Sequence, residues 1–238
     1  MLKIHKLTKH YPGSDKGVTD LSLHILPGDL YAFIGHNGAG KTTTLKAVCG
    51  IHDFEQGDIY IDGINLKEDV LAAKKQIAYI PDNPDLFSYL TGIQYLNFVG
   101  DVFGLSTDAR KERIQTYADA FEITGSLGDL ISSYSHGMKQ KLAIISALIH
   151  QPKLLILDEP FVGLDPKAAM TLKTIMGRLC QKGGAVFFST HVLEVAEKLC
   201  NKVAIIKDGR LVAAGNMADI VKDGSSLESI FMEVAVDE

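Results

Sequence analysis

The sequence predicts an α/β fold, because short apolar runs alternate along the chain with segments of helical pattern. The apolar runs are bounded by Gly, Asp or Pro, and they comprise residues 30–34, 154–157, 185–189 and 203–206. Runs that are apolar at nearly every position suit strands of a parallel sheet, since helices then cover both faces of the sheet. Helical patterns lie between these runs, at residues 41–49, 166–180 and 192–200.

Three further runs predict an antiparallel patch on the same domain. They alternate more strongly between apolar and polar residues and comprise residues 2–7, 18–25 and 59–61. Turn signals such as Asp62-Gly63 lie beside them. Alternation of this kind is typical of strands with one buried face and one solvated face.

The middle of the chain loses its strand signals and becomes helical. Residues 91–103 and 108–121 have helical patterns, and a further helix is expected from Ser135 onward, with Leu142, Ile145, Leu148 and Ile149 at helical spacing. We therefore expect a single domain of residues 1–238. In it, residues 1–85 and 150–238 form the α/β core with its antiparallel patch, and residues 86–149 form an inserted helical subdomain.

Composition and charge favour an acidic globular protein of the cytoplasm. The net charge of -5 disfavours a nucleic-acid coat or a polybasic membrane binder, since both need a positive field. The cysteines Cys49, Cys180 and Cys200 are odd in number and widely spaced, which disfavours a disulfide framework or a zinc site. The apolar runs fall well short of the ~20 residues that cross a bilayer, so another polypeptide would have to supply any membrane crossing.

A glycine-rich loop, GHNGAGKTT, follows the apolar run 30–34 and opens the first helical pattern. Its glycines let several backbone N–H groups point at one phosphate, and the helix after it adds the positive end of its dipole. Lys41 is expected to reach the β- and γ-phosphates of ATP, and the Thr42 hydroxyl is expected to ligate Mg²⁺. The alternative is a glycine-rich turn that holds nothing. The residues that this motif assigns to the nucleotide are Gly35, His36, Asn37, Gly38, Ala39, Gly40, Lys41, Thr42 and Thr43.

Two carboxylates follow the apolar run 154–157, namely Asp158 and Glu159. The carboxyl end of such a strand is where open α/β sheets bind their ligands. We expect Asp158 to hold Mg²⁺, usually through water, and Glu159 to polarise the water that attacks the γ-phosphate. Apolar-Asp-Glu is a weak motif alone, and the phosphate loop upstream makes it strong.

Together these motifs resemble the nucleotide-binding subunit of ABC transporters over nearly the whole chain. The family fold is a P-loop NTPase, RecA-like core with an antiparallel β subdomain and an inserted α-helical subdomain. The resemblance implies that Tyr11 stacks on adenine, with a core aromatic as the alternative. It assigns residues 134–138, YSHGM, to the signature LSGGQ, residues 163–166 with Asp165 to the D-loop, and His191 to the histidine that contacts the γ-phosphate.

The signature segment implies a second subunit. Ser135 is expected to cap the helix that follows it, and the N-terminus of that helix can receive an anion. In the family this anion is the γ-phosphate of ATP held by another subunit, which Ser135 and Gly137 contact. Two ATP molecules would thus lie between two head-to-tail subunits. Both half-sites are present in this chain, which favours a homodimer.

The chain departs from the family pattern in two regions. The signature has Tyr134, His136 and Met138 in place of the usual residues, and His136 brings a side chain where glycine is usual. After the apolar run 77–80, Asp82 stands where the family has a glutamine that touches Mg²⁺ and senses the membrane partner. Asp82 could ligate Mg²⁺ or could simply cap the turn before Asn83.

The leading hypothesis is the ATPase subunit of a membrane exporter, on the cytoplasmic face of the membrane and bound to an integral membrane permease. Residues 80–92 and 226–234 resemble exporters of the ABC-2 type, whose cargo is chosen by the permease. One alternative is a soluble ABC ATPase acting on ribosomes or DNA, although no nucleic-acid partner is expected from the charge. A kinase or GTPase and a non-catalytic regulatory subunit are further alternatives, and Glu159 argues against the last.

Overall fold

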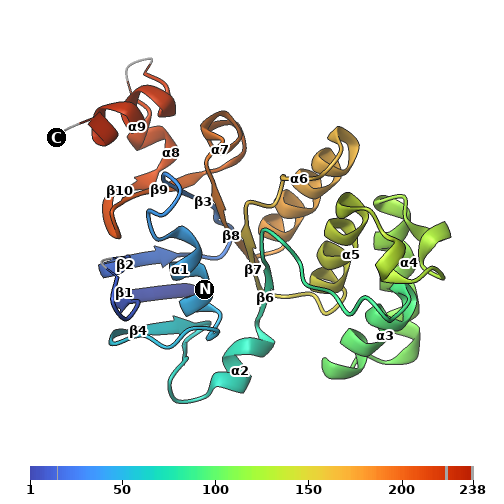
Figure 1. Cartoon of the computed structure of the whole chain (residues 1–238). Coiled ribbons are helices and arrows are strands. Elements are labelled where there is room, and N and C mark those ends of the chain that lie inside the picture. The colour runs from blue at the N-terminus through green and yellow to red at the C-terminus, as the bar shows by residue number, and fades with distance from the viewer. Residues whose placement is uncertain (15, 223–224, 237–238) are drawn as a thin grey trace.

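The computed structural model describes residues 1–14, 16–222 and 225–236 (Figure 1). A six-stranded sheet lies at its centre, with the order β10-β9-β3-β8-β7-β6. Strands β6, β7, β8, β3 and β9 run parallel, and β10 pairs with β9 in the antiparallel sense. The bounds are β3 Leu30–Ile34, β6 Ile77–Ile80, β7 Leu154–Asp158, β8 Ala185–Thr190, β9 Lys202–Lys207 and β10 Arg210–Asn216.

The parallel strands predicted from the apolar runs are confirmed. Residues of β3, β7 and β8 are buried throughout, as expected for strands covered on both faces. Strand β10 was not predicted, although it contains the short apolar run 211–214, and its residues alternate between half-buried and exposed. It forms one edge of the sheet.

A second, four-stranded sheet has the order β2-β1-β4-β5 and is antiparallel, which confirms the predicted patch. Its strands are longer than the sequence pattern indicated. They are β1 Leu2–His10, β2 Gly17–Ile25, β4 Gln56–Ile61 and β5 Ile64–Asn65. In Figure 1 this sheet lies beside α1 (Lys41–Val48), on the side of the molecule away from α4 and α5.

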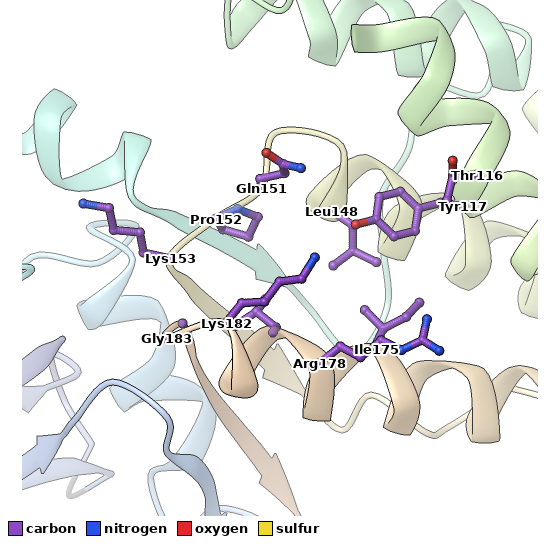
Figure 2. A pocket seen from close by; sticks show the side chains of 12 residues that line it. Thr116, Tyr117, Leu148, Gln151, Pro152, Lys153, Ile175, Arg178, Lys182 and Gly183 are labelled. Atoms are coloured by element: carbon purple, nitrogen blue, oxygen red, sulfur yellow. The ribbon is translucent and has the colours of Figure 1, made fainter.

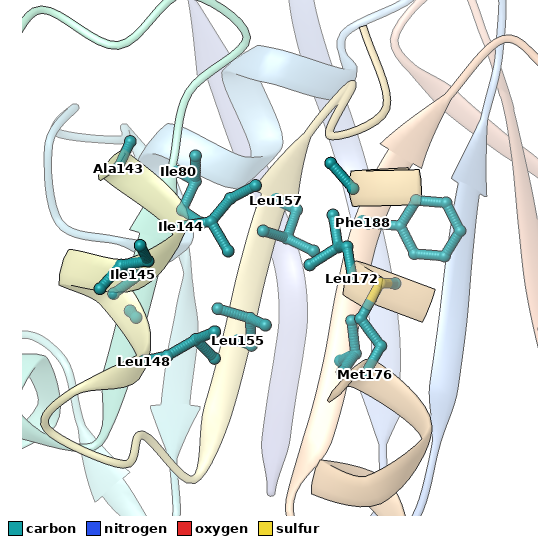
Figure 3. Packing of buried hydrophobic residues seen from close by; sticks show 14 of the residues in the cluster. Ile80, Ala143, Ile144, Ile145, Leu148, Leu155, Leu157, Leu172, Met176 and Phe188 are labelled. Atoms are coloured by element: carbon teal, nitrogen blue, oxygen red, sulfur yellow. The ribbon is translucent and has the colours of Figure 1, made fainter. Parts of the chain in front are cut away.

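The core divides between the two faces of the parallel sheet, because alternate strand residues point to opposite sides. On β3, Tyr31 and Phe33 join the cluster under the antiparallel sheet and α1, whereas Ala32 joins the other cluster. Figure 3 shows the latter cluster, where Leu155 and Leu157 of β7 meet side chains of two helices. The helical residues labelled there are Ala143, Ile144, Ile145, Leu148, Leu172 and Met176.

The helical insert begins with well-capped helices. Thr91 and Gln94 form a reciprocal capping box at the start of α3 (Gly92–Val102), and Ser106 caps α4 (Thr107–Ala120). Short 3-10 turns at Thr124–Ser126 and Ile131–Ser133 lead into α5 (His136–Leu148). Helices α3 and α4 both pack against α5, and they lie to the right in Figure 1, far from the antiparallel sheet.

The remaining helices include two that match the sequence patterns, α6 (Pro166–Gln181) and α7 (Leu193–Leu199). Helices α2 (Val70–Lys75), α8 (Met217–Ile220) and α9 (Leu227–Val236) were not predicted. Within the described residues, no helix combines the length and the apolar character that spanning a bilayer requires.

Candidate nucleotide site

The glycine-rich loop joins the buried strand β3 to helix α1, which begins at Lys41. Gly40 has φ +108°, a conformation that L side chains rarely adopt. At Gly35 a Cβ would lie 2.5 Å from the carbonyl oxygen of Ile206. Glycine is therefore required at both positions by backbone geometry, and the loop lies at the carboxyl edge of the sheet, as the motif needs.

Lys41 is buried, with 7% of its side chain exposed. Its Nζ donates hydrogen bonds to the carbonyl oxygens of Gly35 at 2.7 Å and His36 at 3.2 Å, and it lies 3.9 Å from Oε1 of Glu159. Burial lowers the pKa of Lys41, while the nearby carboxylates of Glu159 and Asp158 oppose this shift. Carbonyl and carboxylate oxygens thus surround the Lys41 ammonium group at the loop.

Asp158 is the last residue of β7 and is 1% exposed. Its Oδ2 accepts a hydrogen bond of 2.6 Å from the Thr42 hydroxyl, and its Oδ1 accepts one from Ser189. A buried carboxylate needs such donors, since an unpaired buried charge costs several kcal/mol, on the order of 5. These contacts bring together the two residues that the sequence assigned to Mg²⁺.

Ser189 is a residue that the sequence analysis missed. Besides donating to Asp158, its Oγ accepts a hydrogen bond of 3.1 Å from the backbone N–H of Glu159. The signal was present, because a polar pair, Ser189 and Thr190, ends an otherwise apolar strand. Only the pairing of β8 with β7 reveals that this serine faces Asp158.

Glu159 has φ +46°, which is sparsely populated by non-glycine residues and is a feature that clusters at functional sites. Its Oε2 lies 3.0 Å from Nδ1 of His191, which follows β8 and is well exposed. The acidic residue expected to activate water and the histidine expected to contact the γ-phosphate are therefore in direct contact.

A hollow of about 330 Å³ lies over the loop. Its lining combines the loop with residues from distant parts of the chain, namely Tyr11, Asp82, Asp158 and Glu159. The Tyr11 hydroxyl lies 3.3 Å from Oγ1 of Thr43, and its ring meets His52 edge-on with 5.9 Å between centroids. Ser14, Lys16 and Gly17 also line this hollow and were not singled out from the sequence.

The oxygen donors in this hollow suit Mg²⁺. Among the described residues no group of three or more His, Cys, Asp or Glu could hold a metal ion by itself. Mg²⁺ bound with a nucleotide needs only one or two protein oxygens, because phosphates and water complete its octahedron. The Thr42 hydroxyl and the Asp158 carboxylate meet that need. Asp82 lines the same hollow, but its Oδ1 also accepts a hydrogen bond of 2.9 Å from the N–H of Asn83.

The signature segment lies outside this hollow. Ser135 caps α5, accepting a hydrogen bond of 3.3 Å from Met138 N–H. Tyr134 is buried and donates to the carbonyl of Ser126 at 2.6 Å, so this departure from the family pattern is accommodated in the core. Gly137 also packs closely, since a Cβ there would lie 2.8 Å from the carbonyl oxygen of Gly163.

The D-loop is tied to the signature helix of the same chain. The His136 ring lies so close to Gly163 that a Cβ on this glycine would meet its Cδ2 at 2.5 Å. Lys141 of α5 forms a 2.7 Å ion pair with Asp165, which also caps α6 through Ala168 N–H at 2.8 Å. The hydrogen bond from Lys141 is the main cause that lowers the pKa of Asp165.

A larger hollow, about 690 Å³, lies at the opposite edge of the parallel sheet (Figure 2). Figure 2 shows Lys182 and Tyr117 reaching into it. Its cationic residues have structural roles. Arg178 and Lys182 lie at the C-terminal end of α6, where positive charge complements the helix dipole, and Lys153 pairs with Asp62 at 2.6 Å. The chemistry assembled at the smaller hollow is missing from this lining.

The similarities of the chain to known proteins agree with this geometry. Residues 18–162 match the family described as ABC transporter. The ABC-type transporter ATP-binding protein EcsA of Bacillus subtilis is 31% identical, over 100% of this chain and 98% of its own length. The bacitracin transport ATP-binding protein BcrA of Enterococcus faecalis is 32% identical, over 93% of this chain and 71% of that protein.

A solved structure of an ATP-binding subunit of an ABC transporter has a TM-score of 0.94 to this chain, at 33% identity and with 99% of both chains covered. The expected fold, a P-loop core with an antiparallel sheet and a helical insert, is thereby confirmed. The family match extends over more than half of the sequence, and this chain matches most of the length of both relatives. The chain therefore belongs to the ABC transporter family of ATP-binding subunits and is an ATPase.

Proposed function

We propose that this chain is the ATPase subunit of an exporter, in which ATP closes two copies head to tail and thereby moves a separate membrane permease. The observation that carries the proposal is the division of the site. The phosphate loop, Asp158 and Glu159 line one hollow, and His191 contacts Glu159. Ser135 and Gly137 lie outside this hollow, at the N-terminus of α5. A second copy can bring that helix N-terminus to the bound nucleotide.

The residues that the sequence assigned to the nucleotide have proposed roles in the cycle. Tyr11 stacks on adenine, and the backbone N–H groups of residues 35–43 hold the phosphates. The Lys41 ammonium exchanges the carbonyls of Gly35 and His36 for the β- and γ-phosphate oxygens. Asn37, Gly38, Ala39, Gly40 and Thr43 contribute as parts of the loop.

The hydrolytic step uses the contact between Glu159 and His191. Glu159 accepts a proton from the attacking water, whose oxygen forms the bond to the γ-phosphorus as the bond to ADP breaks. His191, 3.0 Å from Glu159, is suited to contact a γ-phosphate oxygen and to hold Glu159 in position. Ser135 and Gly137 of the second copy contact the same phosphate, and Asp165 holds the neighbouring D-loop through Lys141.

Mg²⁺ is the proposed metal, held by Thr42 and Asp158, with Asp82 as a further candidate ligand. When bound, this ion would neutralise the negative charge that develops on the phosphates during transfer. Ser189 supports the site by keeping Asp158 hydrogen-bonded and directed at Thr42.

A cluster of exposed aromatic side chains is evidence for the proposed membrane partner. Three aromatic residues follow the loop of Asp82, namely Phe87, Tyr89 and Phe98. The centroid of the Phe87 ring lies 5.9 Å from that of Tyr89 and 5.7 Å from that of Phe98. These three side chains are 43%, 73% and 47% exposed. Exposed aromatics gathered in this way are typical of an interface. We propose that a cytoplasmic segment of the permease packs on them.

Export is the proposed direction of transport, and it rests on the resemblance of residues 80–92 and 226–234 to exporters of the ABC-2 type. A relative named as a linearmycin resistance ATP-binding protein is consistent with it. The alternative, a soluble ATPase on ribosomes or DNA, has no support from the net charge of -5. The proposed location is the cytoplasmic face of the membrane, bound to the permease.

The experiment is co-purification with the permease, in chains carrying Phe98→Asp or, as a matched control, Met170→Asp on the exposed face of α6. A buried charge in an interface costs several-fold in affinity, so Phe98→Asp should lower permease recovery at least roughly fivefold while ATP binding persists. The control should lose nothing. Recovery of the chain free of membranes, unaffected by deletion of the permease, would contradict the proposal.

A further inference from the structure

The C-terminal helix α9 contacts the phosphate loop. The Phe231 ring lies 4.8 Å from the His36 ring, measured between centroids, at an interplanar angle of 55°. Phe231 is 8% exposed and belongs to the main hydrophobic core, whereas His36 is the second residue of the loop. The sequence of residues 226–234 indicates no role beyond a resemblance to exporters.

Helix α9 is firmly seated at its first turn. Ser226 accepts a hydrogen bond of 3.1 Å from Ser229 N–H, which is the geometry of a helix cap. Leu227 is fully buried, and its N–H donates to Oε2 of Glu197 at 2.8 Å. Since Glu197 belongs to α7, a carboxylate of that helix also complements the positive end of the α9 dipole.

One face of α9 therefore spans two parts of the nucleotide site. Leu227 and Phe231 are four positions apart and lie on the same face of the helix. Leu227 holds α7, which begins two residues after His191, and Phe231 reaches His36. In Figure 1 the loop between β3 and α1 rises toward α8 and α9.

The contact with His36 is linked to Lys41. The carbonyl oxygen of His36 accepts hydrogen bonds from Lys41 Nζ at 3.2 Å and from Ala39 N–H at 3.1 Å. An aromatic contact of this kind restricts the ring, and through it the backbone of His36. The same backbone must keep its place when Lys41 releases its carbonyls and turns to a phosphate.

We propose that Phe231 is a positioning residue for the phosphate loop, and that docking of α9 and binding of nucleotide favour one another. The inference rests on the proposed role of residues 35–43 in holding the phosphates. By linkage, whatever α9 contributes to nucleotide affinity, nucleotide contributes equally to the docking of α9.

The chain contains no tryptophan, which makes a single-tryptophan reporter possible. We would compare the full chain carrying Phe231→Trp with one carrying Met232→Trp, its exposed neighbour on α9. Titration with ADP, and with ATP plus MgCl₂, should change the emission of the Phe231→Trp chain in a saturable way with both nucleotides. The Met232→Trp chain should show no such change. Equal responses, or none in either chain when calorimetry shows binding, would overturn the inference.

A second measurement tests the energetic link. Phe231→Ala should weaken nucleotide binding by roughly three- to tenfold and raise KM similarly, with kcat within about twofold, whereas Phe231→Tyr should restore affinity. His36→Ala should have a similar effect, and the double variant should be no weaker than the stronger single one. Met232→Ala is the control.

Additive effects of the two substitutions, or unchanged affinity in a folded Phe231→Ala chain, would contradict the role of Phe231. This failure is distinct from that of the proposed function, in which the parent chain itself would bind no ATP. If Phe231→Ala unfolds, the tryptophan pair and the His36 variant still decide the question.

Discussion

The Thr42 hydroxyl donates a hydrogen bond of 2.6 Å to Asp158, a residue 116 positions away in the sequence. Thr42 is the second residue of helix α1 and Asp158 is the last residue of strand β7, and α1 packs against β7. The contact joins the phosphate loop to the acidic end of the strand. A hydroxyl and a carboxylate are thereby held side by side, as two oxygen ligands of one Mg²⁺ would need to be.

Removal of the Thr42 hydroxyl should make the affinity for ATP independent of MgCl₂. The chain with Thr42→Ala is expected to bind ATP about equally with and without MgCl₂, whereas the parent binds it roughly tenfold or more tightly with MgCl₂. Thr42→Ser keeps the hydroxyl and serves as the control. A magnesium effect that survives Thr42→Ala at full size would exclude this residue as a ligand.

Loss of the Lys41 ammonium should weaken nucleotide binding. Hydrogen bonds to charged groups contribute about 1.5–3 kcal/mol, so Lys41→Ala should raise the Kd for ATP roughly 10- to 150-fold in calorimetric titrations. Lys46→Ala, on the same helix but outside the lining of the hollow, is the matched control. Equal affinity in the two variants would refute the phosphate role of Lys41.

A substitution at Ser135 should impair the contact with the ATP of the second copy and leave the binding of ATP to its own copy unchanged. Ser135→Asp retains an N-cap for α5 but brings a negative charge against the partner's phosphate. We expect unchanged melting temperature and unchanged binding of ATP to the monomer. The dimer fraction seen by sedimentation should fall at least about tenfold. Dimerisation equal to that of the parent would rule out a phosphate at this helix terminus.

His150 should make the stability sensitive to acid. Burial, aided by Arg113, lowers the pKa of His150 to about 4, and its ring stacks on Phe103 at 3.7 Å. In the unfolded chain this histidine takes up a proton near pH 6.5, so its stabilising contribution is complete above that pH and is lost as the pH falls through about 4.

The corresponding loss of unfolding free energy is at most roughly 3 kcal/mol between pH 7 and pH 4. Denaturant unfolding across this range should show a shallower decline for His150→Phe, which keeps the stacked ring but cannot be protonated. If the free energy of unfolding declined equally in the parent and the variant, protonation of His150 would not contribute to the loss of stability. Groups common to both chains cancel in this comparison.

The elements that the sequence predicted correctly are those with a strong local signal. The apolar runs before Gly35 and Asp158 are buried strands, and Ser135 caps its helix. The phosphate loop and the acidic pair each follow a predicted strand, and the carboxyl ends of parallel strands meet at one edge of the sheet. The sequence therefore also predicted that these two motifs would lie at one hollow. The roles of these residues toward ATP remain predictions.

The contacts that the sequence could not predict depend on tertiary packing. Ser189 reaches Asp158 only because β8 lies between β3 and β7. Phe231 and His36 lie at opposite ends of the chain, and no local pattern links them. The His136 ring, which stood out as a departure from the family pattern, rests on Gly163 because that glycine has no Cβ. Each of these pairs is set by which elements are neighbours in space.

The central claim is that ATP brings two copies of this chain together, and Glu159→Gln tests it most directly. This change should preserve ATP binding but remove the proton acceptor, so hydrolysis should fall by about 100-fold or more. Sedimentation of Glu159→Gln with ATP and MgCl₂ should then reveal a stable dimer that is absent with ADP. A chain that stays monomeric with bound ATP, or that retains the ATPase rate of the parent, would contradict this account.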